Sequence, residues 1–383
     1  SEANPGTVDA AEKLARVPFT AGNRVDLLID GEATFSSILD GIRAARDYVL
    51  VQFYMVRDDE LGQRLASELA GKARSGVPVH FLYDEIGSIG LPGAYIEGLR
   101  TAGVEATPFH SRKGPGNRFQ LNFRNHRKTV VVDGQVAWVG GHNVGVEYLG
   151  QDPKIGYWHD VHVRIEGPAV IGAQLAFLED WRWATDGALE CLSWTPRLGS
   201  GQAESLVIAS GPADPMETAL LMFMHAITSA RERIWIASPY FVPDDAIVQA
   251  LQLAALRGVD VRILIPEKAD SRLVTLAAYS YFNDVKAGGA RFYRYQRGFL
   301  HGKFMLIDTN VATVGTANFD NRSFRLNFEI TAVVSNEGFA DEVRRMFEHD
   351  FQHSRLMVLG ELDAKPLWFR LAVRVARLLA PLL

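Results

Sequence analysis

Apolar stretches of strand length alternate with amphipathic stretches of helix length along the chain, and the same order occurs twice. The first copy, AARDYVLVQFYMVRDDELGQRLASELAGKARSGVPVHFLYDE, begins at Ala44, and the second, SARERIWIASPYFVPDDAIVQALQLAALRGVDVRILIPEK, begins at Ser229. Each contains an apolar strand, an Asp-Asp pair, a helix with apolar residues at helical spacing, a Gly-Val turn and a second apolar strand. A strand, a crossover helix and a strand form a βαβ unit, which requires parallel pairing of the two strands.

The likeness continues downstream, because EGPAVIGAQLAFLEDW from Glu166 resembles EGFADEVRRMFEHDF from Glu337. We therefore predict an α/β protein that arose by tandem duplication, each half a mixed β-sheet flanked by helices. Gly and Ser interrupt the pattern at TPRLGSGQAES, Thr195 to Ser205, which indicates the boundary between the halves. The expected division is an N-terminal segment 1–30, two domains 31–200 and 201–363, and a C-terminal helix 364–383.

A polar motif adjoins an apolar strand in both halves. NHRKTVVVDG, from Asn125, places His126 and Lys128 two residues apart and therefore on one face of a strand. LHGKFMLIDTN repeats this pattern in the second half. The positions that match at a constant offset are His126, Lys128, Asp133, Gly140 and Asn143 with His301, Lys303, Asp308, Gly315 and Asn318. The Asp-Gly pair after the strand predicts a two-residue hairpin loop in which Val132 faces Gln135.

Composition and charge limit the classes of function. The chain has 383 residues, 48% of them hydrophobic and 22% charged, as in ordinary folded proteins. A net charge of −5 argues against a surface built to hold nucleic acid. Two local segments, 111–128 and 291–303, are basic and contain no acidic residue, which favours an anionic ligand beside each motif. The single cysteine, Cys191, excludes an internal disulfide and is expected to be buried and inert.

The terminal stretch PLWFRLAVRVARLLAPLL is polar only at Arg370, Arg374 and Arg377. Spacings of four and three place these arginines on one stripe of a helix. The pattern favours an amphipathic helix on an anionic membrane surface. The alternative is a terminal helix docked on its own protein.

Two histidines related by duplication predict a site at the pseudo-twofold interface of the halves. One histidine would attack phosphorus and form a phosphohistidine, while the other protonates the leaving alkoxide and then deprotonates an incoming alcohol or water. Imidazole, with an ordinary pKa of about 6.5, suits either role. The side chains of Lys128, Lys303, Asn143 and Asn318 would neutralise the charge on the phosphate oxygens, so neither a metal nor another cofactor is expected.

A histidine nucleophile needs its second ring nitrogen held by a carboxylate. Asp160 in WHDVHV matches Glu329 in NFEITAV, and these two acids are the candidates for that role. Asp133 and Asp308 belong to the motif and to the expected catalytic set, although an aspartate in a hairpin turn more often binds its own backbone. A metal site at His159, Asp160 and His162 is disfavoured, because strand alternation places neighbouring residues on opposite faces.

With these residues in view, the chain resembles the phospholipase D superfamily, which carries two copies of His-x-Lys-x4-Asp followed by Gly and Asn. NFRNHRKTVVVDG and GTANFDNRSFRLNFEI are similar to stretches of bacterial cardiolipin synthases. The resemblance implies tandem phospholipase D-like domains that transfer a phosphatidyl group between two phosphatidylglycerol molecules and release glycerol. It also implies that His126 is the nucleophile and His301 the acid/base, an assignment that the internal symmetry leaves open.

The resemblance further implies attachment to the bacterial inner membrane. Members of this subfamily often begin with two membrane-spanning helices, and this chain shows no such segment. Attachment would then rest on the terminal helix and the basic segments, or the native protein is longer.

Two enzymatic alternatives share the same residues. A hydrolytic phospholipase D would let water attack the intermediate and yield phosphatidic acid. A phosphodiesterase or nuclease would act on nucleic acid, which the acidic net charge and the apolar terminal helix disfavour. A lipid-binding protein without activity is a third alternative, but simple binding does not require two facing histidines.

Overall fold

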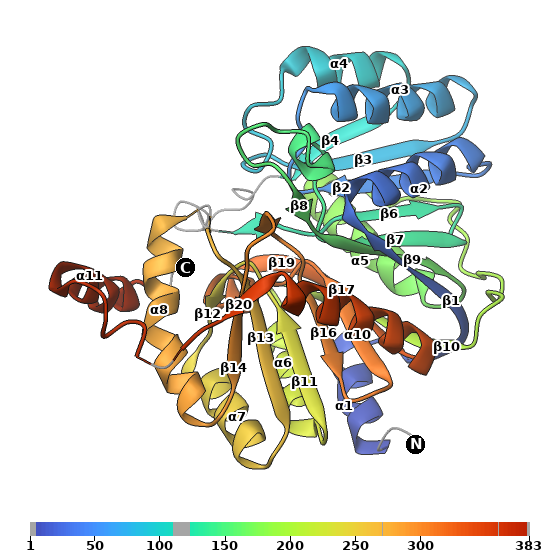
Figure 1. The fold of residues 1–383 in the computed structure, drawn as a ribbon. Coiled ribbons are helices and arrows are strands. Elements are labelled where there is room, and N and C mark those ends of the chain that lie inside the picture. Colours follow the sequence, from blue (N-terminus) through green and yellow to red (C-terminus); the bar gives the residue numbers. More distant parts are fainter. Residues whose placement is uncertain (1–4, 110–122, 270, 359, 381–383) are drawn as a thin grey trace.

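The computed structural model describes residues 5–109, 123–269, 271–358 and 360–380. Its centre is one mixed sheet that runs through both halves of the chain (Figure 1). In the first half the strands follow the order β4 (Glu105–Phe109), β3 (Val79–Asp84), β2 (Val49–Phe53), β6 (Thr129–Val132), β7 (Val136–Gly140), β9 (Val161–Glu166) and β1 (Thr20–Ile29). The sheet continues with β10 (Ala203–Ser210), β19 (Asn327–Ser335), β17 (Val311–Gly315), β16 (Phe304–Ile307), β11 (Arg233–Ala237), β13 (Asp260–Pro266), β14 (Arg291–Tyr295) and β20 (Ser354–Leu356).

The strand order confirms the duplication. The antiparallel pair β1 and β10 lies at the centre, and the strands on either side of it follow the same plan. Both predicted βαβ units are present, since β2 pairs in parallel with β3 across α3 (Glu60–Arg74), and β11 with β13 across α7 (Asp245–Leu256). The halves therefore share one sheet and do not form two separate ones.

Matching residues begin and end the two crossover helices. The carboxylate of Asp59 accepts a hydrogen bond from the backbone N–H of Gly62 at the start of α3, and Asp244 accepts from Ala246 and Ile247 at the start of α7. Each is therefore an N-cap that satisfies otherwise unpaired N–H groups. After the helices, Gly76 and Gly258 have φ angles of 88° and 89°, a conformation that favours glycine.

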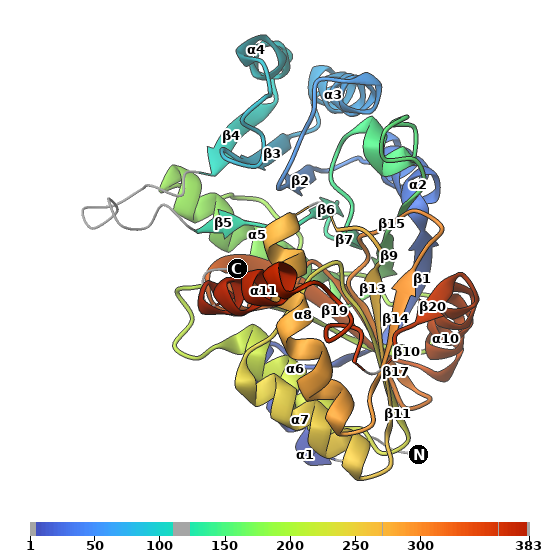
Figure 2. The same ribbon diagram turned by 60° about the vertical axis from the view of Figure 1, so that its left-hand side comes forward.

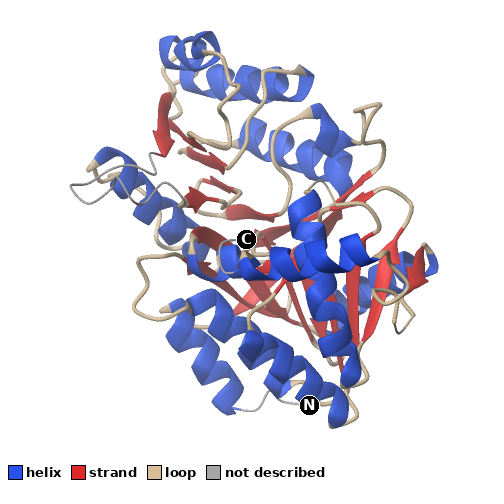
Figure 3. Cartoon of the chain, turned by 90° about the vertical axis from the view of Figure 1, so that its left-hand side faces the viewer, coloured by secondary structure: helices blue, strands red, loops and turns tan. Residues whose placement is uncertain are grey.

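Helices cover both faces of the sheet (Figures 2 and 3). Those of the first half are α2 (Asp30–Ala44), α3, α4 (Gly93–Thr101) and α5 (Val170–Thr185), and those of the second half are α6 (Thr218–Ser229), α7, α8 (Arg272–Ala287), α9 (Asn321–Arg325) and α10 (Glu337–Gln352). Figure 2 shows α6, α7 and α8 on one side of the second-half strands and α10 on the other. Helix α5 contacts β10 and α10 contacts β1, so each half's last helix packs on a strand of the other half.

The described part of the expected N-terminal segment, residues 5–30, contributes to this body. Helix α1 (Pro5–Ala15) packs on α6 and β10, and β1 is hydrogen-bonded to β9 and β10. At the other end of the chain, α11 (Leu367–Leu378) lies at the periphery against α8 (Figure 1).

Two local expectations were wrong. The hairpin pairs Val132 with Val136, so its loop has three residues and Val132 does not face Gln135. The loop is fixed from outside the hairpin, because the backbone N–H groups of Arg46, Asp47 and Tyr48 donate to the carboxylate of Asp133. Cys191 is exposed, because the connection between α5 and β10 crosses the surface.

Candidate active site

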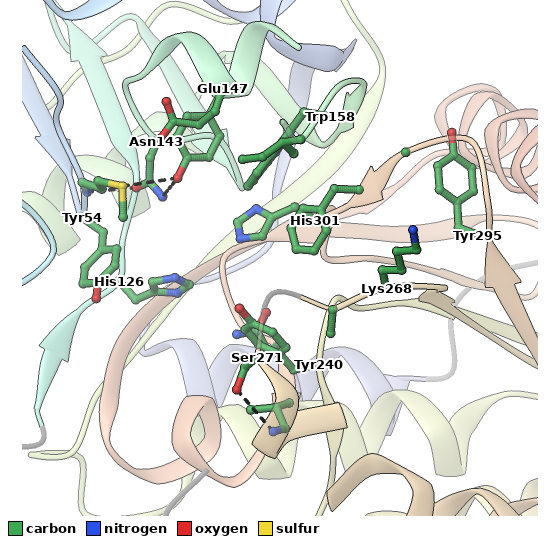
Figure 4. A pocket seen from close by; sticks show the side chains of 18 of the residues that line it. Tyr54, His126, Asn143, Glu147, Trp158, Tyr240, Lys268, Ser271, Tyr295 and His301 are labelled. Carbon is green, nitrogen blue, oxygen red and sulfur yellow. Dashed lines mark hydrogen bonds between the residues drawn. The ribbon is translucent and has the colours of Figure 1, made fainter. Parts of the chain in front are cut away.

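Each motif histidine directly follows a short strand, and that strand pairs with a strand of the other half. His126 follows β5 (Arg124–Asn125), which pairs with β19, and His301 follows β15 (Phe299–Leu300), which pairs with β8 (Trp158–His159). The backbone N–H of His126 donates to the carbonyl of Phe328 at 2.9 Å, and that of His301 donates to the carbonyl of His159 at 2.8 Å. Each histidine is thus held by backbone of the opposite half. The two imidazoles point toward one another in the cavity (Figure 4).

The carboxylates that contact the histidines are also exchanged between the halves. Nδ1 of His126 lies 3.0 Å from Oε2 of Glu329, and Nδ1 of His301 lies 2.6 Å from Oδ2 of Asp160. Because a carboxylate only accepts hydrogen bonds, each neutral imidazole must carry its proton on Nδ1. The lone pair of His126 Nε2 is therefore available on the opposite side of the ring, whereas Nε2 of His301 lies 3.0 Å from Lys303 Nζ and can accept a hydrogen bond from it.

Burial and nearby charges set the protonation states of the two histidines and their two carboxylates. Burial lowers the pKa of His126 to about 4 and that of His301 to about 3, and nearby lysine charges add to this effect. Burial opposes ionisation of Asp160 and Glu329, but the surrounding histidines and lysines hold the pKa of both carboxyls below its ordinary value. Near neutrality the site thus contains two ionised carboxylates and two neutral imidazoles. An anion bound between the imidazoles would raise the pKa of both.

The two motif lysines lie behind the histidines and are almost completely buried. Lys128 Nζ donates to the carbonyl oxygen of His126 at 2.6 Å and lies 5.2 Å from the ring centroid of Tyr54. Lys303 Nζ lies 2.9 Å from Nδ1 of His301. Burial lowers the pKa of Lys128 well below its ordinary value, and the charge of Lys303 lowers it further.

A cavity of about 960 Å³ opens in front of the histidines, between the halves. Asn143 and Asn318 both line it, as the motif spacing predicts. Within the described part of the chain, three buried polar atoms at its wall make no hydrogen bond: Trp158 Nε1, Asn318 Oδ1 and Asn327 Oδ1. Buried polar atoms normally have partners. These three atoms therefore indicate the position of a polar ligand or of bound water.

Aromatic residues of the wall were not predicted from the sequence. The ring centroid of Trp158 lies 5.0 Å from that of His301, and Tyr54 lies at the same distance from His126 (Figure 4). Trp158 lies two residues before Asp160, in WHD, and Asn327 lies two residues before Glu329, in NFE. The alignment of the halves therefore contained a signal for both residues.

In the basic segment 111–128, Arg112, Lys113 and Arg118 lie outside the described residues.

Asp133 and Asp308 do not line the cavity, and both bind backbone N–H groups, the alternative role of a hairpin aspartate. Asp308 accepts from the backbone N–H groups of Arg231, Glu232 and Arg233, just as Asp133 accepts from three N–H groups of the first half. Both aspartates follow their strand at the end remote from the histidine. In each half the motif aspartate thus ties its hairpin to the loop before the neighbouring strand.

Replacing either aspartate by alanine is therefore expected to affect stability more than chemistry. Loss of a charged acceptor for three backbone N–H groups should lower the free energy of unfolding by roughly 2 kcal/mol. We expect kcat of the folded Asp133→Ala and Asp308→Ala variants to stay within about threefold of the wild type. Urea denaturation and steady-state kinetics on the same preparations check both statements. A loss of kcat of about 100-fold or more in a fully folded variant would restore the catalytic assignment.

The three residues considered as metal ligands point to different partners. Asp160 holds His301, and Nδ1 of His162 lies 3.0 Å from Nδ1 of His142. His159 lies between two carboxylates, with Nδ1 at 2.8 Å from Asp30 and Nε2 at 3.0 Å from Asp350. The described residues contain no group of three or more His, Cys, Asp or Glu side chains arranged to hold a metal ion.

His159 joins the two halves, because Asp30 lies in α2 and Asp350 in α10. Although burial opposes its charge, the two carboxylates raise the pKa of His159 to about 10. A pKa above the ordinary 6.5 means that the imidazolium stabilises the fold fully below about pH 6.5 and that this contribution is lost as the pH rises through about 10.

The variant His159→Gln should therefore lose roughly 3–5 kcal/mol of stability at neutral pH, because two carboxylates are left without their cation. Its stability should also fall less steeply than that of the wild type between about pH 6.5 and 10. Urea denaturation across this range measures both. Parallel pH profiles for the two proteins would show that His159 is not charged in the folded state.

The two α/β halves are fused, and each contributes one histidine and one carboxylate to a site at their pseudo-twofold interface. This arrangement defines an enzyme of the phospholipase D class. The family described as "Cardiolipin synthase, PLD-like domain" matches residues 223–351. Cardiolipin synthase A of Pseudomonas aeruginosa is 51% identical over 374 residues, which cover 98% of this chain and 76% of that protein. Cardiolipin synthase A of Pseudomonas putida is 49% identical, covering 98% of this chain and 78% of that protein. The chain belongs to the cardiolipin synthase family.

Solved structures share the fold. Phosphatidylserine synthase of Haemophilus influenzae superposes with a TM-score of 0.73 at 15% identity, covering 98% of this chain and all of that one. Polyphosphate kinase of Porphyromonas gingivalis superposes with a TM-score of 0.61 at 14% identity, covering 93% of this chain and 52% of that one. At these identities the comparison concerns the fold alone.

Proposed function

We propose that the protein transfers a phosphatidyl group from one phosphatidylglycerol to another through a phosphohistidine intermediate and releases glycerol. Two neutral imidazoles that face each other, each held at Nδ1 by a carboxylate of the opposite half, carry this proposal. The names of the related proteins agree with it.

In the first step, Nε2 of one histidine attacks phosphorus and the bond from phosphorus to the glycerol oxygen breaks. The second histidine, protonated once the anionic lipid has raised its pKa, donates its proton to that oxygen. In the second step, the now neutral imidazole removes a proton from a hydroxyl of the second lipid. The resulting oxygen attacks phosphorus, the bond from phosphorus to nitrogen breaks, and cardiolipin is formed.

Four groups of the motif would stabilise the phosphate during both steps. Asn143 and Asn318 line the cavity, and Lys128 and Lys303 are buried beside the histidines, where a bound phosphate anion would favour their ammonium forms. Their charge acts over a short distance in a medium of low polarity, where electrostatic stabilisation of an anionic transition state is strong. The phosphate charge would in turn relieve the repulsion between the two lysines.

The direct test is mass spectrometry of the lipids formed from phosphatidylglycerol in mixed micelles with excess chelator. We expect cardiolipin and one released glycerol per cardiolipin. Phosphatidic acid as the sole product would establish the hydrolytic alternative instead. Loss of all turnover in chelator, restored by a divalent cation, would contradict a mechanism that relies on the protein's own cations.

We also propose that α11 contacts an anionic membrane surface. No helix among the described residues is long and apolar enough to cross a membrane. One face of α11 packs on the protein, since Val373 and Ala376 are buried and Arg377 forms an ion pair with Asp284 of α8. This face fits the alternative expectation of a terminal helix docked on its own protein. The opposite face exposes a stripe of large apolar side chains: Leu367, Trp368, Leu371, Val375 and Leu378.

Such a stripe, with Arg370 and Arg374 on the same helix, suits insertion into the interface of an anionic bilayer. The variant Leu371→Glu should bind vesicles of phosphatidylglycerol about tenfold more weakly, because one leucine side chain is lost from the apolar contact and a negative charge is added. Leu256→Glu, at an exposed leucine on α7, is the matched control. Equal vesicle binding by both variants in a sedimentation assay would refute a role for α11.

A further inference from the structure

The two sides of the cavity differ in charge although the duplication relates them. Arg124 occupies the position of Phe299 in the repeat, two residues before the motif histidine. Arg322 occupies the position of Glu147, four residues after the motif asparagine. All four of these residues line the same cavity. The duplication has therefore left cationic side chains at the two positions on one side and an aromatic and an acidic side chain on the other.

On the His301 side the wall is aromatic and its charge is paired. Trp158 packs against Phe299 with ring centroids 4.8 Å apart, and both rings lie close to His301. The carboxylate of Glu147 lies 2.7 Å from Nε of Arg57, which neutralises it. These two positions therefore offer apolar surface and no net charge to a ligand.

On the His126 side two guanidinium groups from different halves come together. Arg124 lies in β5, where it pairs with Asn327 of β19, and Arg322 lies in α9. Burial lowers the pKa of Arg322, and the charge of Arg124 lowers it further. Two like charges in a partly buried wall oppose each other, and an anion placed between them would relieve this repulsion.

Three carboxylates, Asp84, Asp320 and Glu329, act electrostatically on these arginines, and the first two bind backbone N–H groups. Asp84 accepts from the N–H groups of Ile86, Gly87 and Asn125, and Asp320 accepts from the N–H of Ser323. Burial also raises the pKa of Asp320 to about 6, which still leaves this carboxyl mostly ionised at neutral pH. Arg124 Nη1 also donates to the carbonyl of Phe123 at 2.8 Å, so an anion would bind to these guanidinium groups in addition to the partners that they already have.

We propose that Arg124 and Arg322 bind the phosphate of the acceptor lipid, so that the cavity selects an anionic glycerophospholipid as its second substrate. The inference rests on the proposed function, because only a second phospholipid brings a second phosphate into the cavity. In the transfer, the reacting hydroxyl and this phosphate belong to one glycerol headgroup, so the second phosphate must bind close to the histidines. Guanidinium groups match phosphate oxygens in geometry and charge. The buried Oδ1 of Asn327, beside Arg124, is placed to accept a hydrogen bond from the remaining headgroup hydroxyl.

The test compares two acceptors for the same donor, phosphatidylglycerol. One reaction forms cardiolipin, and the other forms phosphatidylethanol with ethanol, which has no phosphate. In Arg124→Gln and Arg322→Gln, we expect cardiolipin formation to fall about 30-fold each, as for loss of one charge-assisted contact, and phosphatidylethanol formation to fall much less. Arg322→Lys should recover part of the loss, because the charge is kept and the planar geometry is not.

Lys268→Gln is the matched control, since Lys268 is a cation on another part of the same cavity wall and the proposal gives it no selective effect. Three results would overturn the proposal. In the arginine variants, they are an equal loss of product with both acceptors, or no loss of cardiolipin formation. In Lys268→Gln, it is a selective loss of cardiolipin formation. Failure of the proposed function is a separate result: the wild type would then form neither cardiolipin nor phosphatidylethanol. Melting temperatures of all variants identify any that fail to fold.

Discussion

Replacing His126 or His301 by alanine is expected to lower the rate of phosphatidyl transfer by at least about 1,000-fold, because one removes the nucleophile and the other the acid/base. The double variant should be no slower than the worse single variant by more than about tenfold, since the two groups act in one reaction sequence. The formation of cardiolipin from phosphatidylglycerol measures this effect directly.

Neither substitution should unfold the protein. Both side chains face a cavity, and the backbone hydrogen bonds that hold them remain in the variants. His353→Ala, at the end of α10, is the matched control and should retain nearly full activity, because its imidazole contacts the carbonyl of His349 and does not line the cavity. Collapse of the circular dichroism spectrum in His126→Ala or His301→Ala would show that these histidines are structural and would remove the main support for the proposed chemistry.

Asp160→Asn and Glu329→Gln are expected to have the second largest effect, a loss of about 100-fold to 10,000-fold in kcat, because an amide no longer fixes the Nδ1–H tautomer or stabilises the imidazolium. The shapes of the side chains are preserved, so the geometry of the site should change little. Glu329 also accepts hydrogen bonds from the side chains of Thr316 and Asn327. Side chains other than histidine therefore hold Glu329 more firmly than Asp160.

Steady-state kinetics with phosphatidylglycerol check this expectation, and the KM should change much less than kcat. A variant with normal kcat and raised KM would mean that the carboxylate contributes to binding and not to the imidazole. Nuclear magnetic resonance of the ring nitrogens offers an independent readout, since the tautomer of the partner histidine should change in each variant.

Much of this protein was determined by local sequence. The parallel βαβ units, the capping aspartates and the paired His-x-Lys motifs depend on residues close together in the chain, and their repetition made each signal stronger. Asp160 and Glu329 were found in the same way, because the alignment of the halves fixed their positions. The hairpin register was missed by one residue, because contacts of Asp133 with a loop about 85 residues earlier set it.

Only the tertiary structure decided which groups work together. The pairings of β1 with β10, of β5 with β19 and of β15 with β8 join the halves, and these junctions bring Glu329 to His126 and Asp160 to His301. The bridge of Asp30, His159 and Asp350 and the arginine side of the cavity arise from the same fusion. Each joins residues about 130 to 200 positions apart. Local propensity and spacing contain no information on such contacts, since the contacts depend on how the two halves join into one sheet.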